Sequence, residues 1–276
     1  MGLTWPTARR CARPVADPAV LVAVADRVAT ITLNRPQARN ALNGDIRRTL
    51  GYIVPQLDDN PDVDVLILTG SDPAFCAGLD LKELASGDHD IAASVGDTSR
   101  RQVPLPETRK PIIGAINGAA VTGGLELALN CDFLIASERA RFADTHARIG
   151  VQPGWGLTVL LPQAIGLRRA KEMSATGNYI DAATAHAWGL VNHVVAHERL
   201  LPYCRELAAA IVSNDGAGVR AILDTYDEGS LTTAAAAWTV EAYNARAWLA
   251  QGGGRQEEIA ARRAAVQARG RSQAQA

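Results

Sequence analysis

A repeated succession of an apolar strand, a turn and a helix constrains the fold of this chain more than any other feature. Short apolar runs bounded by Pro or Gly are typical of strands that are buried on both faces of a parallel sheet. Successive units of this kind predict an α/β fold in which mainly parallel strands are backed by helices. The predicted units are strand 63–69 with helix 80–85, strand 112–117 with helix 124–130, and strand 133–137 with helix 155–165.

The segments on either side of these units differ from them. Two short strands are predicted within 20–34, and a helix capped by Asn43 or Asp45 runs to about Leu57. A stretch rich in Gly, Ser, Asp and Pro, 86–106, predicts a mobile loop. From about 202 onward only alanine-rich helical patterns occur. These helices are expected at 202–214, 216–226 and 231–250, with a weak charged helix at 255–269.

Three regions are therefore predicted: a disordered tail at 1–17, a core at 18–200 and a helical end at 201–276. The 276 residues are 47% hydrophobic, which is enough for a sizeable core, and the net charge is −1. This net charge gives no overall positive potential that would attract nucleic acid. The sequence also has no apolar run of the ~20 residues that a membrane helix needs. The four cysteines form no CxxC pair, so no metal site is expected and a reducing, cytoplasmic location is predicted.

Two glycine-marked turns join a buried strand to a helix, at Ala77-Gly78-Leu79-Asp80 and at Thr122-Gly123-Gly124. Glycine permits positive φ and lets the backbone approach a ligand closely. The first N–H groups of a helix lack partners within the helix and point outward. Two such turns can hold an oxyanion, although each could equally be no more than a tight turn. Neither turn matches a phosphate-binding loop.

The residues around these turns carry a family resemblance. Phe75-Cys76-Ala77-Gly78-Leu79-Asp80-Leu81-Lys82 and Gly118-Ala119-Ala120-Val121-Thr122-Gly123-Gly124-Leu125-Glu126-Leu127-Ala128 resemble the two signatures of the enoyl-CoA hydratase/isomerase, or crotonase, family. Further matches are Ile31-Thr32-Leu33-Asn34-Arg35-Pro36, Asn40-Ala41-Leu42, Lys110-Pro111, Cys131-Asp132 and Gly150-Val151-Gln152-Pro153-Gly154. The similarity extends over roughly residues 20–200 in order.

The resemblance implies a spiral of ββα units, a helical C-terminal trimerisation region, and coenzyme A thioesters as substrates, with no separate cofactor. It implies that the backbone N–H groups of Leu79 and Gly123 form the oxyanion hole, and that Glu126 is an acid/base residue. A homotrimer, or a hexamer built as a dimer of trimers, is expected. The expected substrate-binding positions are Ala38, Arg39, Ala77, Gly78, Asp80, Leu81, Gly118, Ala120, Thr122, Gly124, Thr145, Gly150 and Trp155.

The chain departs from the family's pattern at one catalytic position. Where the hydratases carry a second glutamate, twenty positions after the first, this chain has His146. Histidine exchanges protons near neutral pH and can serve as the partner of Glu126. Asp144 could orient His146 if the two side chains share a face. The exchange leaves open whether the chain hydrates an alkene as its relatives do.

We therefore predict a lyase of fatty acid metabolism, an enoyl-CoA hydratase-like enzyme that stabilises an enolate. The alternatives are an enoyl-CoA isomerase, an acyl-CoA hydrolase or a decarboxylase that uses Glu126 and His146, and a non-catalytic acyl-CoA-binding protein. Trp155 is expected to floor the acyl pocket or simply to pack in the core. The remaining histidines, which include His197, are expected to be structural or at the surface.

Overall fold

Two sheets organise the chain in the computed structural model, which describes residues 18–86, 105–230 and 232–251. The larger sheet has the strand order β1-β2-β3-β5-β7-β10 and the smaller one β4-β6-β8-β9. In the larger sheet β1 and β2 are antiparallel and the other neighbours are parallel. The predicted tail at 1–17, most of the predicted loop at 86–106 and the predicted helix at 255–269 lie outside the described residues.

The strands of the larger sheet follow the apolar runs of the sequence. They are β1 (Val20–Ala25), β2 (Val28–Leu33), β3 (Val65–Gly70), β5 (Ile112–Ile116), β7 (Phe133–Ser137) and β10 (His193–Val195). All residues of β3 and β5 are buried, as expected for strands covered on both faces. β1 lies at the edge of the sheet, and its residues after Val20 are exposed.

Each strand of the central part of the larger sheet is followed by a short strand of the smaller sheet and then by a helix. β3 leads to β4 (Ala74–Cys76) and α2 (Leu81–Ser86), β5 leads to β6 (Ala119–Val121) and α4 (Gly123–Leu129), and β7 leads to β8 (Arg141–Ala143) and α5 (His146–Ile149). β4, β6 and β8 are parallel neighbours, and β9 (Ile180–Asp181) pairs with β8. The predicted α/β spiral of ββα units is therefore confirmed.

The simpler strand–turn–helix interpretation of the residues was wrong at two places. Residues 74–76 form β4 and residues 119–121 form β6, where no strand was predicted. Three-residue strands are too short to show an alternating pattern, and their pairing is decided by distant segments. The expected helix at 155–165 is α6 (Leu157–Ile165), but the helix that follows β8 is α5. Neither α5, α7 (Leu167–Thr176), α8 (Ala182–Trp188), β9 nor β10 was predicted.

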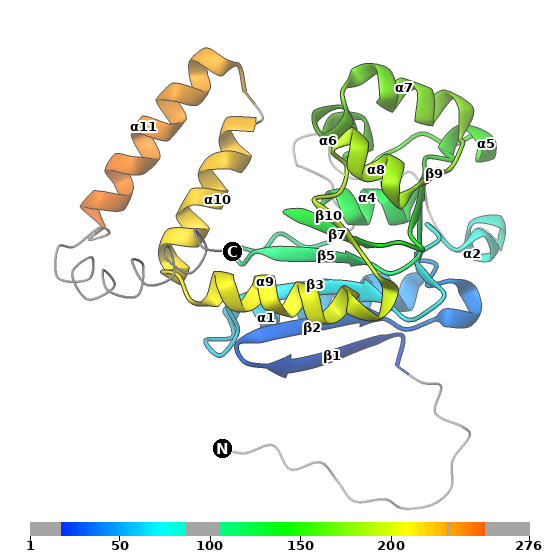
Figure 1. Cartoon of the computed structure of the whole chain (residues 1–276), viewed down its shortest axis with the longest axis horizontal. Coiled ribbons are helices and arrows are strands. Elements are labelled where there is room, and N and C mark those ends of the chain that lie inside the picture. The colour runs from blue at the N-terminus through cyan, green and yellow to red at the C-terminus, as the bar shows by residue number, and fades with distance from the viewer. Residues whose placement is uncertain (1–17, 87–104, 231, 252–276) are drawn as a thin grey trace, which may run out of the picture.

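Two helices cover opposite faces of the larger sheet. α9 (Leu200–Val212) lies across one face, where Leu200, Cys204 and Ala208 pack with buried residues of β2, β3, β5 and β7 (Figure 1). The opposite face packs against α1 (Gly44–Asp59), which Asn43 caps by accepting a hydrogen bond from the N–H of Ile46 at 3.0 Å. Residues of α4 also belong to this second core, so α4 is packed against the larger sheet.

The C-terminal helices α10 (Gly216–Ser230) and α11 (Ala234–Ala250) form a pair that stands away from the core in Figure 1. α10 has no buried residue, and Ile222 and Tyr226 on it are exposed. The helical character expected for this region is observed. None of the helices that the structure describes is both long and apolar enough to cross a membrane.

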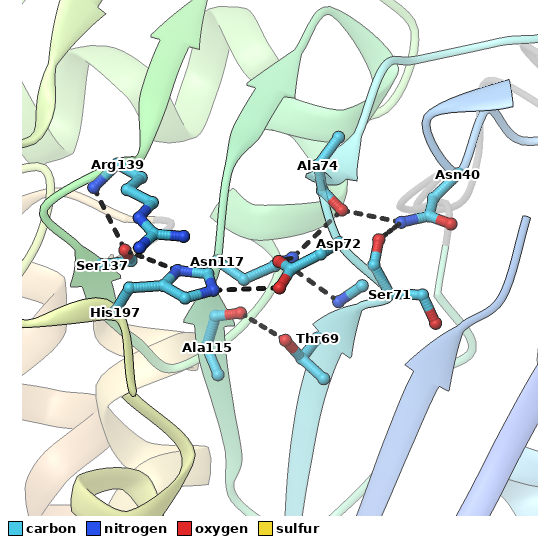
Figure 2. A network of polar contacts seen from close by, with 11 residues as sticks. Asn40, Thr69, Ser71, Asp72, Ala74, Ala115, Asn117, Ser137, Arg139 and His197 are labelled. Carbon is cyan, nitrogen blue, oxygen red and sulfur yellow. Dashed lines mark hydrogen bonds and ion pairs between the residues drawn. The ribbon is translucent and has the colours of Figure 1, made fainter. Parts of the chain in front are cut away.

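A network of polar contacts joins the carboxyl ends of β3, β5 and β7 (Figure 2). The Asp72 carboxylate accepts hydrogen bonds from Asn117 at 2.8 Å and from Nε2 of His197 at 2.9 Å. Nδ1 of His197 lies 3.0 Å from Oγ of Ser137, at the end of β7. These contacts anchor the turn that leads from β3 to β4, and β4 carries the first glycine turn.

Candidate active site

The two glycine-marked turns lie against each other. Gly78 has φ +93°, and a Cβ there would lie 3.3 Å from the backbone nitrogen of Gly123. A Cβ at Gly124 would lie 2.1 Å from the carbonyl oxygen of Cys76, so only glycine lets α4 pack this closely on β4. The turns are therefore brought together by glycine, as their positions in the sequence suggested.

The N–H groups of Leu79 and Gly123 lie side by side at this junction. The nitrogen of Leu79 is 3.6 Å from the Cβ position built on Gly123. Among the hydrogen bonds within the described ranges, neither N–H is a donor, whereas the N–H groups of Ala77 and Asp80 donate to Arg39 and Leu42. Two backbone donors in one place can stabilise a developing oxyanion.

The first turn is held from behind by an asparagine and an arginine. Asn40 is fully buried, and its side-chain amide donates to the carbonyls of Ser71 and Ala74 at 2.7 Å (Figure 2). Arg35 forms an ion pair with Asp80 at 3.0 Å and also donates to the carbonyl of Ala41. These contacts tie the segment around Leu79 to the chain before α1.

The second turn is held by two threonines. Thr122 has φ +54°, a value that is strained for a β-branched residue and persists only where its surroundings enforce it. Its hydroxyl lies 2.5 Å from the hydroxyl of Thr145, and the N–H of Thr145 donates to it at 3.3 Å. Because Thr145 directly precedes His146, this contact couples the Gly123 turn to the segment that carries the histidine.

Glu126 lies on α4 with only 2% of its surface exposed. One carboxylate oxygen, Oε1, accepts a hydrogen bond from the backbone N–H of Trp155 at 2.9 Å. The other, Oε2, lies 3.5 Å from Nε2 of His146. The structure therefore brings together the two residues that the sequence singled out as an acid–base pair.

His146 begins α5 three residues after the end of β8, and the chain bends between them. Oδ1 of Asp144 accepts a hydrogen bond from the backbone N–H of His146 at 3.1 Å and lies 2.6 Å from Nδ1 of its ring. An aspartate that bonds the backbone two residues on forms this kind of turn. Asp144 and His146 meet because the strand ends at Ala143, and not because they share a strand face.

Charge and burial act in opposite directions on His146. Burial of the ring would lower its pKa, but hydrogen bonds to Asp144 and Glu126 and the charges of both carboxylates outweigh this effect and raise the pKa of His146 to about 9. Burial would likewise raise the pKa of Asp144, but hydrogen bonds from His146 and Ser174 hold that pKa below its usual value. Asp144 and Glu126 therefore favour the protonated form of His146.

These groups face a cavity of about 190 Å³. The predicted site residues that line it are Ala77, Leu79, Leu81, Thr122, Gly123, Glu126, Thr145, His146 and Trp155. A Cβ at Gly123 would lie 3.1 Å from the Trp155 ring, so the tryptophan closes the cavity next to one of the two backbone donors. Val121, Ile149, Val151, Gln152, Gly154 and Tyr179 also line the cavity and were not predicted.

Eight predicted substrate-binding residues lie outside this lining: Ala38, Arg39, Gly78, Asp80, Gly118, Ala120, Gly124 and Gly150. Arg39 supports the site through its carbonyl, which accepts from the N–H of Ala77. Gly118 packs on the backbone of Pro73, and Ala120 is fully buried in β6. Gly150 ends α5 in a left-handed conformation. The motifs that resemble the family signatures therefore include residues that support the two turns without lining the cavity.

No group of His, Cys, Asp and Glu side chains that could hold a metal ion occurs within residues 18–86, 105–230 and 232–251. Cys76 is buried next to the first glycine turn, and burial raises the pKa of its thiol to about 12. A thiol held in its neutral form is a poor nucleophile. The polar groups that face the cavity include the backbone at Leu79 and Gly123 and the side chains of Glu126 and His146.

A family model for enoyl-CoA hydratase/isomerase matches residues 24–257. The chain belongs to the enoyl-CoA hydratase/isomerase family. A probable peroxisomal enoyl-CoA hydratase of Arabidopsis thaliana is 40% identical over 222 residues, which cover 80% of this chain and 83% of that protein. A crotonyl-CoA hydratase of Syntrophomonas wolfei is 37% identical over 79% of this chain and 84% of its own length.

Solved structures of the family agree with the fold. The crystal structure of an enoyl-CoA hydratase from Mycobacterium smegmatis is 51% identical, with a TM-score of 0.71, and covers 85% of this chain and 100% of that one. An enoyl-CoA hydratase from Bacillus anthracis is 34% identical, with a TM-score of 0.76 over 83% of this chain and 90% of its own. The predicted family is thereby confirmed.

Proposed function

We propose that this chain is an enoyl-CoA hydratase that adds water reversibly to the double bond of a 2-enoyl-CoA. The observation that carries this proposal is the convergence of Glu126, His146 and the N–H groups of Leu79 and Gly123 on one cavity. The similarity to proteins named as enoyl-CoA hydratases over most of the chain supports the same conclusion.

The thioester carbonyl oxygen accepts hydrogen bonds from the N–H groups of Leu79 and Gly123. Removing one such donor from an oxyanion hole slows catalysis by about 10²- to 10³-fold. The Glu126 carboxylate takes a proton from water while the water oxygen bonds to Cβ of the substrate. The π electrons of the double bond move toward the carbonyl and give an enolate, whose negative charge lies on the held oxygen.

His146 completes the reaction by giving its Nε2 proton to Cα of the enolate. Glu126 is then protonated and His146 is neutral. The Glu126 proton returns to Nε2 of His146 across the 3.5 Å that separates the two side chains. One hydroxide equivalent and one proton have then been added to the substrate, and both side chains are back in their starting states. The reaction as written needs no cofactor beyond the coenzyme A of the substrate.

Trp155 supports a short acyl substrate. Its ring closes the cavity beside Gly123, and its backbone is held at both ends. The N–H of Trp155 donates to Glu126, and its carbonyl accepts from the side chain of Asn130 at 3.1 Å. Because a ring fixed in this way cannot easily move aside, it should exclude a long acyl chain. Crotonyl-CoA is therefore the first substrate to test.

The function is tested by incubating the purified full chain with crotonyl-CoA. We expect the conjugated absorbance of the substrate to disappear and the product mass to increase by one water. Glu126→Gln should slow this by at least about 10²- to 10⁴-fold, because a neutral amide cannot accept the proton of water. Glu172→Gln, an exposed change on α7, is the matched control and should retain full activity.

Other products would replace the proposal. A product of unchanged mass indicates isomerisation of the double bond, free coenzyme A indicates hydrolysis, and loss of carbon dioxide from a carboxylated substrate indicates decarboxylation. Tight binding without any product, unaffected by Glu126→Gln, indicates a binding protein. No turnover across a series of 2-enoyl chain lengths would contradict hydration.

We also propose that α10 and α11 contact further copies of this chain in a homotrimer or a hexamer. The exposed Ile222 and Tyr226 on α10 support an interface there. Sedimentation of the purified chain should give at least three copies, whereas a monomer would contradict the proposal. The buried free thiols of Cys76, Cys131 and Cys204 support the proposed cytoplasmic location, because cysteines stay reduced there.

A further inference from the structure

The hydrogen bond between Asp144 and His146 decides which ring nitrogen faces the cavity. Oδ1 of Asp144 lies 2.6 Å from Nδ1, and an ionised carboxylate can only accept hydrogen bonds. Nδ1 must therefore carry a proton. The other ring nitrogen, Nε2, is left to face Glu126 at 3.5 Å, in the cavity that both side chains line.

We propose that Asp144 is a positioning residue for the hydration reaction, and that it holds His146 so that a protonated Nε2 is presented to the substrate. This inference rests on the proposed function and adds to it a residue outside the cavity lining. The neighbouring aspartate supplies the negative charge that keeps the ring protonated.

Asp144 is built into the fold as an ionised group. It is 1% exposed, and it accepts hydrogen bonds from the backbone and the ring of His146 and from Ser174 on α7. A buried carboxylate is costly unless such donors satisfy it. The three donors come from two segments, so the position of Asp144 relative to the ring is fixed on both sides.

The titratable groups around His146 indicate how its charge depends on pH. Asp144 precedes α5, Glu126 faces the ring from α4, and Tyr179 lines the same cavity from the segment before β9. The two carboxylates raise the pKa of His146 to about 9. Loss of the Asp144 charge should lower this pKa toward its ordinary value of 6.5.

The experiment measures kcat and KM for crotonyl-CoA as a function of pH, for the wild type and for Asp144→Asn. In the wild type, kcat should fall as pH rises through about 9, where the proton donor is lost. Asp144→Asn should lower kcat by about 10²- to 10⁴-fold, as loss of the charge in an aspartate–histidine pair can do, with KM changed only a few-fold. The alkaline limb of its pH profile, where kcat falls as pH rises, should lie at least about one pH unit lower than in the wild type.

The matched control is Asp72→Asn, because Asp72 also bonds a histidine ring, that of His197, away from the cavity. This variant should keep the alkaline limb of the wild type. The proposal is overturned if Asp144→Asn keeps both its alkaline limb and its kcat within about three-fold of the wild type. If Asp144→Asn does not fold, Ser174→Ala replaces it and should shift the limb in the same direction by a smaller amount.

A second readout separates this proposal from the proposed function. Because the folded pKa of His146 lies above its ordinary 6.5, the paired imidazolium stabilises the fold fully below pH 6.5, and this contribution is lost as pH rises through about 9. Thermal unfolding of the wild type should show this loss, and that of Asp144→Asn should show a smaller loss at lower pH, because Glu126 still raises the pKa of His146. If crotonyl-CoA is not turned over but the wild type loses stability as pH rises, only the hydration reaction is refuted. If crotonyl-CoA is turned over but the wild type shows no such loss of stability, the role of Asp144 is refuted.

Discussion

Two aspartate–histidine pairs in this protein have similar geometry and different surroundings. Asp144 and His146 lie 2.6 Å apart beside the cavity, and Asp72 and His197 lie 2.9 Å apart at the carboxyl ends of the larger sheet. In the first pair the side chains are 2% and 8% exposed, whereas Asp72 is 61% exposed and His197 17%. The two pairs differ most in the contacts of the ring nitrogen that does not bond the aspartate.

Both ring nitrogens of His197 are bonded within the protein. Nε2 lies against Asp72, and Nδ1 lies 3.0 Å from Oγ of Ser137, which is fully buried (Figure 2). Nε2 of His146 instead faces Glu126 and the cavity. A bonded aspartate therefore does not by itself identify a catalytic histidine. The nitrogen opposite the aspartate must also reach a space that a substrate can enter.

Replacing each histidine in turn should give the largest difference between the two pairs. His146→Gln should lower kcat for crotonyl-CoA by about 10²- to 10⁴-fold, because glutamine cannot deliver a proton to Cα. His197→Gln should change kcat by less than about three-fold. Steady-state kinetics on both purified variants checks this, and equal losses would show that the two pairs do not differ in function.

Removing the serine of the second pair should have a smaller effect, and on stability alone. Ser137→Ala takes a hydrogen-bond partner from His197 and from the backbone N–H of Arg139, which lies 3.1 Å from Oγ. Urea unfolding should show a loss of about 1–2 kcal/mol. Activity should not change. A loss of turnover would mean that Ser137, His197 and Asp72 take part in the chemistry.

The sequence predicted the part of the site that depends on local motifs. The two glycine turns were visible because glycine lets backbone approach backbone. The family resemblance pointed to Glu126, Leu79 and Gly123, and all three line one cavity in the structure. His146 was found as a departure from a family pattern. The buried strands and glycine turns that recur in order predicted strand–turn–helix units, and the spiral of ββα units was implied by the family resemblance.

The remaining features depend on contacts between distant segments. β4 and β6 are three residues long and carry no periodic pattern, so only their pairing reveals them. Asp72 meets His197 across 125 positions of sequence. Asn40 was visible as part of a motif, but its two bonds to the turn before β4 were not. Asp144 was considered and not assigned, because the end of β8 could not be located to the residue.

We infer that Asp144 holds His146 through Nδ1 and keeps its ring protonated. Nitrogen-15 NMR titration of the five histidines of the full chain measures both properties, with His146→Gln used for assignment. His146 should titrate near pH 9 and keep its Nδ1 proton after it becomes neutral. Titration near pH 6.5, or a neutral form protonated at Nε2, would contradict this inference.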